Sequence, residues 1–193
     1  QEVEWFAERR PEIALQARAA DRKALIEREE KRRTPLWRDY LAARDAAESG
    51  ARVLRECGDF PLLSGGDTNL YSLFVERATA LVAAPGIVGL LTPSGIAADK
   101  GASDFFRTLT DADDAGAARL AALYDFENRG NPGGSYFPDV DSRFKFCTLI
   151  FGGDSRRFKQ SSCAFFLQDT AELADPARSM ALSAADFRLV NPN

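Results

Sequence analysis

The chain has 193 residues, of which 45% are hydrophobic and 28% charged, so it is long enough to bury the core of a globular domain. Its net charge of -4 gives no overall basic field, and its three cysteines and absence of histidine exclude histidine-dependent catalysis and any common zinc site. No apolar run reaches the roughly 20 residues that cross a bilayer. We expect a cytoplasmic protein with reduced cysteines and no metal, and Gln1 in place of an initiating methionine favours a piece of a longer protein.

Residues 1–57 are rich in Ala, Arg, Glu and Lys and lack glycine until Gly50, which predicts exposed helices. Thr34 and Pro35 predict a helix start, with Thr34 as the N-cap and Pro35 as the first helical residue. The basic residues 31–33 are either a solvated helix end or a phosphate contact. We expect this region to be a helical insertion.

Helical and strand patterns alternate over residues 58–170, as in a doubly wound α/β sheet. The patterns predict helices at 70–82 and 102–109 and strands at 87–91, 120–126, 144–151 and 162–167. The continuous apolar run 87–91 predicts an interior strand covered on both faces. The short polar connection between the last two strands predicts an antiparallel hairpin at the end of a partial sheet, and residues 171–193 are read as a tail.

Two strand ends carry candidate functional residues, because ligands of open α/β sheets bind beyond the ends of the strands. Thr92, Pro93 and Ser94 form a small turn that is either the lip of a binding crevice or a plain strand-to-helix connection. Asp125, Glu127 and Asn128 end the next strand. Without another acidic group at ligand spacing, we expect these three to be helix caps or loop anchors, and we assign no metal.

Three blocks of the sequence occur in an order that resembles the second half of the catalytic domain of adenine-specific DNA methyltransferases. The blocks are "NLYSLFVERATALVAAPGIVGLLTPSGIAADKGASDFFRTL", "LAALYDFENRG" and "FPDVDSRFKFCTLIFGG". They are most similar to the enzymes of type IIG restriction-modification systems and related phage-defence methyltransferases. The resemblance covers roughly residues 59–153 and implies a Rossmann-like methyltransferase sheet.

The resemblance implies transfer of a methyl group from S-adenosylmethionine to an adenine that is flipped out of double-stranded DNA. In that family an Asn-Pro-Pro-aromatic tetrapeptide holds the adenine amino group, and a glycine-bearing loop holds the cofactor. Neither element occurs in this sequence. We therefore expect the intact protein to be an enzyme, and this segment to contain no catalytic residue and to be inactive alone.

The resemblance also implies which residues form the far wall of the base pocket. Phe151, at a strand end beside two glycines, is the positional match for the aromatic that stacks on the adenine, although a core phenylalanine is the alternative. Thr92, Pro93 and Ser94 would line the same pocket. Phe144 and Phe146 are expected in the core. The basic residues that either contact DNA phosphates or are solvated are Arg143, Lys145, Arg156, Arg157 and Lys159.

Two other functions fit the same patterns. The chain is alternatively a non-catalytic module of a larger defence protein, whose helical region and basic turns bind DNA or a partner protein. A different nucleotide-using α/β enzyme with the same strand and helix order is the other alternative.

Overall fold

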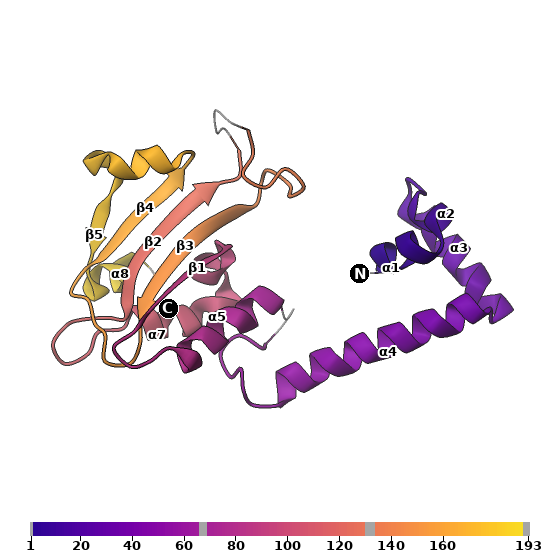
Figure 1. The fold of residues 1–193 in the computed structure, drawn as a ribbon, viewed down its shortest axis with the longest axis horizontal. Helices are drawn as coiled ribbons and strands as arrows, with labels where there is room; N and C mark the ends of the chain where they lie inside the picture. The colour runs from indigo at the N-terminus through magenta and orange to yellow at the C-terminus, as the bar shows by residue number, and fades with distance from the viewer. Residues whose placement is uncertain (1, 66–68, 130–133, 191–193) are drawn as a thin grey trace. The chain divides into compact units, whose positions relative to one another are not determined.

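The computed structural model describes residues 2–65, 69–129 and 134–190, which belong to two compact units, residues 1–56 and residues 57–193 (Figure 1). The boundary lies one residue from the end of the predicted helical insertion. Residues 171–190 are not a separate tail, because they include a strand that pairs with the sheet of the second unit. None of the helices in the described ranges is both long enough and apolar enough to span a membrane.

The first unit is helical, as the composition predicts. Its helices are α1 (Glu2–Arg9), α2 (Pro11–Ala14), α3 (Ala19–Arg32) and α4 (Pro35–Glu56). The fully buried ring of Phe6 lies 4.9 Å from Trp5 and 5.0 Å from Tyr40, measured between ring centroids, so α1 packs against the start of α4. The predicted start of α4 is confirmed, since the Trp37 N–H donates to Thr34 Oγ1 at 3.1 Å.

The second unit contains a five-stranded mixed sheet in the order β1-β3-β2-β4-β5 (Figure 1). The strands are β1 (Ile87–Pro93), β2 (Leu120–Glu127), β3 (Lys145–Gly152), β4 (Ser161–Leu167) and β5 (Met180–Leu182). β3 is antiparallel to both β1 and β2, β4 is parallel to β2, and β5 is antiparallel to β4. Consequently β1, β2 and β4 all end at the same edge of the sheet.

The predicted hairpin between residues 144–151 and 162–167 is wrong, because β3 and β4 lie on opposite sides of β2. The polar connection between them passes the start of β2, where the Ala118 N–H donates to the Phe158 carbonyl at 2.9 Å. This pairing guides the chain around β2 to its far side. The connection therefore skips over one strand, β2, and is not a hairpin turn.

Helices pack mainly on one face of the sheet. Those whose residues join the core there are α5 (Leu70–Leu81), α6 (Gly95–Ala98), η1 (Lys100–Ala102), α7 (Ser103–Thr110) and α8 (Ala184–Val190). The short helix η2 (Thr170–Ala174), which is followed by η3 (Pro176–Arg178), packs Leu173 against Phe126, Ala164 and Leu167 on the other face. Phe105 and Leu109 of α7 are fully buried against alternate strand residues such as Leu123 and Leu149. The other face carries an aromatic cluster in which Phe126 and Phe146 stack at 5.3 Å. The predicted α/β class is confirmed.

β1 is an edge strand of this sheet, which contradicts the predicted interior position. Ile87 and Leu91 are 53% and 60% exposed. A continuous apolar run shows that a strand has low polarity, but it does not show how many strands flank it. α5, which contacts β1, also exposes Leu70, Phe74 and Leu81.

Candidate functional site

A cleft of about 1220 Å³ lies at the end of the sheet where β1, β2 and β4 finish and β3 begins. We call it the strand-end cleft. It is lined on several sides by aromatic rings, which are those of Tyr71, Phe106, Phe144, Phe165, Phe166 and Phe187. Its position, beyond the ends of parallel-running strands, is the usual place for a ligand in an α/β protein.

The lining of the strand-end cleft is rich in cations. It includes five basic side chains, Lys100, Arg107, Arg143, Lys145 and Arg188, and three acidic ones, Asp99, Asp111 and Asp125. The chain as a whole carries a net charge of -4. Four of the five cations are paired with a carboxylate, namely Arg107 with Asp104, Arg143 with Asp141, Lys145 with Asp125 and Arg188 with Asp111. The cleft therefore offers an anionic ligand several N–H donors, but its positive charge is largely balanced by these carboxylates.

A buried carboxylate links three strand ends at the floor of the cleft. Asp125 of β2 is only 5% exposed, and it accepts a short hydrogen bond from Ser94 Oγ, just after β1. Its other oxygen, Oδ2, lies 2.8 Å from Lys145 Nζ at the start of β3. Both oxygens of the buried carboxylate are thus occupied by neighbouring strands, and Asp125 is an anchor, as the sequence predicts.

The turn after β1 forms one lip of the cleft. Pro93 and Ser94 line it, whereas Thr92 is buried and lines a neighbouring apolar cavity of about 520 Å³. A side chain at Gly95 would overlap the Asp99 carboxylate and approach the Tyr71 hydroxyl, so the glycine permits close packing of the turn. The structure therefore brings two of the three predicted turn residues to the cleft.

The aromatic residue exposed at the mouth of the cleft is Phe144, which the sequence analysis placed in the core. It is 65% exposed and lines both cavities. The prediction was wrong because Phe144 precedes the first residue of β3, so the strand alternation that packs the half-buried Phe146 into the aromatic cluster does not extend to it. The position of Phe144 next to Arg143, at the junction of loop and strand, was the signal available in the sequence.

A second exposed ring, that of Phe166, comes from an irregularity in β4. Tyr124 pairs with Ala164 and Phe126 pairs with Leu167, so two residues of β4 lie opposite Asp125 alone. This β-bulge gives Phe166 a φ of 56° and leaves it 61% exposed. The ring centroid lies 4.5 Å from Lys145 Nζ. No local pattern in the sequence indicated this bulge.

Asn128 anchors the loop between β2 and β3. It is 1% exposed, and its Nδ2 donates to the carbonyls of Phe137 at 3.0 Å and Val140 at 3.2 Å. Its Oδ1 accepts from the Phe137 N–H at 2.9 Å. The expectation of a loop anchor is confirmed for Asn128, and the anchored segment leads directly to Phe144.

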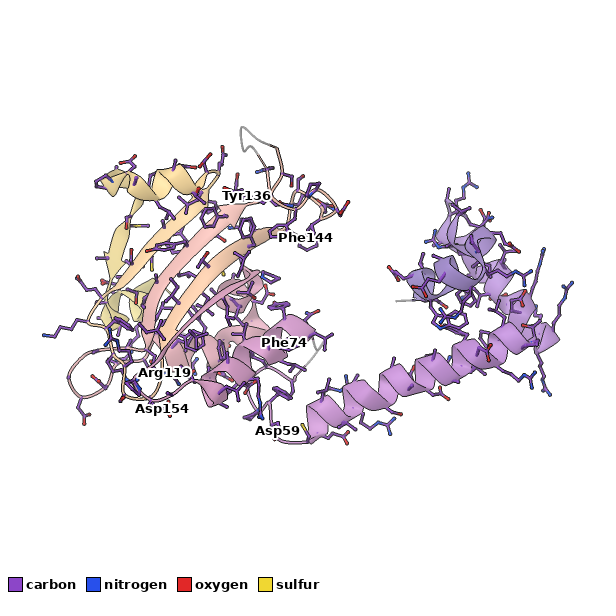
Figure 2. The ribbon with its side chains drawn as sticks, in the orientation of Figure 1. Asp59, Phe74, Arg119, Tyr136, Phe144 and Asp154 are labelled. Carbon is purple, nitrogen blue, oxygen red and sulfur yellow. The ribbon has the colours of Figure 1, made fainter. Side chains whose placement is uncertain are left out.

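Phe151 is not available to stack on a ligand. It is 0% exposed, and the Arg119 guanidinium lies over its ring at 6.0 Å. It also lies at the end of the sheet opposite Phe144, as the positions of Phe144 and Arg119 in Figure 2 show. The neighbouring glycines serve backbone packing, since a side chain at Gly153 would overlap the carbonyls of residues 83 and 84.

The five basic candidates divide between the two ends of the sheet. Arg143 and Lys145 line the strand-end cleft. Arg156, Arg157 and Lys159 follow Phe151, and the Arg157 guanidinium donates to the Gly153 carbonyl at 3.1 Å. The two groups therefore do not face one common ligand site, because β3 separates them by its whole length.

Arg143 pairs with its neighbour Asp141, whose Oδ2 lies 2.6 Å from Arg143 Nη2. This hydrogen-bonded pair lowers the pKa of the Asp141 carboxyl below its usual value. Arg143 is 83% exposed at the side chain. Its guanidinium is thus oriented by Asp141 and remains accessible to a phosphate.

Cysteine chemistry does not contribute to the site. Cys147 lines the cleft but is 1% exposed, and burial raises the pKa of its thiol to about 12. Burial likewise raises the pKa of the Cys163 thiol to about 11. Within the described ranges there is no group of three or more His, Cys, Asp or Glu side chains that is placed to hold a metal ion.

The fold and the cleft together define a mixed α/β protein with an aromatic-lined opening, rich in N–H donors, at its strand ends. No protein-family model matches the chain, and no curated protein matches its sequence.

Proposed function

We propose that the chain is part of an adenine-specific DNA methyltransferase and that the strand-end cleft receives an adenine extruded from double-stranded DNA. The observation that carries the proposal is the exposed ring of Phe144 at the mouth of this cleft, between Arg143 and Lys145. Enzymes that act on a flipped base stack it on aromatic side chains and bind its polar edge. An aromatic ring flanked by two cations offers a stacking surface beside two phosphate-binding groups.

The size of the cleft and its N–H donors support this assignment. Its volume of about 1220 Å³ exceeds what one base requires, so it has room for the attached sugar and phosphate. Lys145 has three N–H donors, of which Asp125 uses one. The remaining donors are available to a base nitrogen or a phosphate oxygen.

Phe144 takes the stacking role that the sequence analysis gave to Phe151. Both residues belong to the stretch that resembles the methyltransferases, but only Phe144 is exposed. Pro93 and Ser94 keep their proposed place as the opposite lip of the pocket. Of the basic candidates, only Arg143 and Lys145 line the cleft, and we assign Arg143 to a phosphate and Lys145 to the base or its phosphate.

In such an enzyme S-adenosylmethionine supplies the methyl group. We assign no residue of this chain to the cofactor, because the space beside Gly95, at the start of the helix after β1, is filled by Asp99 and Tyr71. The chain contributes a wall of the base pocket and performs no transfer alone. The exposed Ile87 and Leu91 on the free edge of β1 fit a partial sheet that continues in a longer protein.

The proposal is tested by fluorescence anisotropy with two duplexes that differ at one position. One carries an adenine opposite an abasic site, and the other has the same adenine paired with thymine. An unpaired base costs less to extrude, so we expect the chain to bind the abasic duplex about tenfold more tightly. Phe144→Ala should remove this preference, because it deletes the stacking surface.

Phe74→Ala is the matched control, since Phe74 is 73% exposed but lies on α5 outside the cleft (Figure 2). It should leave the preference unchanged. Equal, salt-sensitive binding of both duplexes would contradict the base-pocket assignment and favour the non-catalytic DNA-binding module. Absence of binding to either duplex would contradict both.

A further inference from the structure

Phe166 has a strained backbone conformation, and the packing of its side chain does not compensate for that strain. A φ of 56° places it in the left-handed region, which bulky side chains rarely adopt. The ring is 61% exposed, so little apolar surface is buried in compensation. Strained residues of this kind cluster at ligand sites, where the surrounding structure holds them in place.

The surrounding structure does hold this bulge. Arg178 Nη2 donates to the Phe166 carbonyl at 2.9 Å and to the Phe165 carbonyl at 3.4 Å. The same nitrogen lies 2.9 Å from Glu172 Oε2. Through Arg178, the segment that follows β4 thus holds the left-handed residue Phe166 in place.

The bulge places the Phe166 ring beside the Lys145 ammonium in the cleft. A regular β4 would place one residue opposite Asp125, whereas the bulge places two there and turns Phe166 outward. Its ring centroid then lies 4.5 Å from Lys145 Nζ, which is bonded to Asp125. One chain of contacts therefore runs from Ser94 through Asp125 and Lys145 to Phe166, across the ends of four strands.

We infer that Phe166 is a ligand-binding residue of the strand-end cleft, where its exposed ring supports a purine base beside Lys145, and that its strained backbone is retained for this contact. The choice of a purine rests on the proposed function. A ring and an adjacent ammonium offer a base a stacking face and a hydrogen-bond donor together. Phe166 and Phe144 are then the two exposed aromatic contacts of the same cleft.

The variant Phe166→Gly separates binding from folding, because glycine adopts the left-handed conformation readily and has no ring. We expect its thermal unfolding midpoint to equal or exceed that of the unaltered chain. Its affinity for the duplex with an adenine opposite an abasic site, and for free adenosine followed by NMR, should fall about tenfold. Phe166→Leu, which keeps an apolar side chain without an aromatic face, should lose affinity similarly, and Phe74→Ala should lose none.

Each result decides the inference. A thermal unfolding midpoint several degrees lower for Phe166→Gly would show that the ring stabilises the fold, and this would overturn the inference. Unchanged affinity for both the abasic duplex and adenosine would show that the ring does not contact the ligand, and this would overturn it as well. Loss of affinity in Phe144→Ala alone would overturn it and leave the proposed function standing. Adenosine binding that depends on Phe166, with equal affinity for the paired and abasic duplexes, would support it while contradicting the flipped-base function. Failure of the unaltered chain to bind either probe would overturn both.

Discussion

Lys145 Nζ lies 2.8 Å from Asp125 Oδ2, and this contact joins the first residue of β3 to the end of β2. Because Asp125 also accepts from Ser94, the ends of β1, β2 and β3 are fixed to one another at the floor of the cleft. The pairing leaves Lys145 partly exposed, with 36% of its side chain accessible. A single carboxylate thus both orders the sheet edge and positions the cation that faces the ligand.

Removal of this carboxylate should destabilise the fold. Asp125→Ala leaves the Lys145 ammonium and the Ser94 hydroxyl without their acceptor, but water can reach the partly exposed lysine. We expect a loss of about 1–3 kcal/mol in the free energy of unfolding, measured with urea. Asp154→Ala is the control, because Asp154 is 83% exposed where it pairs with Arg119 (Figure 2). Its expected cost is below about 1 kcal/mol, and equal losses in the two variants would contradict the account.

Phe151 and Phe144 should respond to truncation in opposite ways. Phe151→Ala removes a fully buried ring and should cost about 3–5 kcal/mol in the free energy of unfolding. Phe144→Ala removes an exposed ring and should cost about 0.5 kcal/mol or less. Urea unfolding of both variants measures these costs. A small cost for Phe151→Ala would mean that its ring is not in the core.

The sequence predicted the elements that depend on local signals. The helix predicted at 70–82 is observed at Leu70–Leu81, the strand predicted at 120–126 at Leu120–Glu127, and Thr34 caps α4. The order of the strands was not predictable in this way, because it depends on pairing between residues distant in the chain. The connection that leads the chain from β3 past β2 to β4 has the same polar composition as a hairpin turn, so its composition does not reveal the strand that it skips.

The candidate site was predicted in part. The turn at Pro93 and Ser94 does line the cleft. The two glycines after Phe151 suggested a ligand site, but they are needed for close packing of the backbone. Gly153 is required by the approach of the backbone at residues 83 and 84, a contact that the local sequence does not reveal. Phe166 was missed because a bulge interrupts the strand alternation without a turn residue to mark it.

Asn128 should control the order of the loop that leads to Phe144. Asn128→Ala removes the buried amide that bonds to Phe137 and Val140, at an expected cost of about 2 kcal/mol. Faster hydrogen exchange should then appear in residues 134–144 and not in β3. Asn128→Asp keeps the acceptor for the Phe137 N–H but turns a buried carboxylate oxygen toward the two carbonyls, so it should cost at least as much as Asn128→Ala at neutral pH. Uniformly faster exchange across the sheet would contradict a local anchoring role.

The buried thiols should make the fold less stable in alkali. Burial raises the pKa of the Cys147 thiol from its ordinary value of 9.0 to about 12 in the folded chain, so above pH 9 the unfolded chain binds fewer protons than the folded one. The free energy of unfolding therefore falls as pH rises from about 9 toward 12, by up to about 1.4 kcal/mol per pH unit for each such thiol. Cys163 should act in the same direction up to about pH 11. Urea unfolding as a function of pH should show a shallower decline when both are replaced by alanine, and an equally steep decline would contradict this cause.

The most direct test of the account locates the extruded base on the protein. A duplex carrying 8-azidoadenine opposite an abasic site is bound to the chain and irradiated, and the cross-linked peptides are identified by mass spectrometry. We predict cross-links at the mouth of the strand-end cleft, around Phe144 and Phe166. Cross-links confined to the helical unit or to the turn at residues 154–160, with none at the cleft, would contradict it.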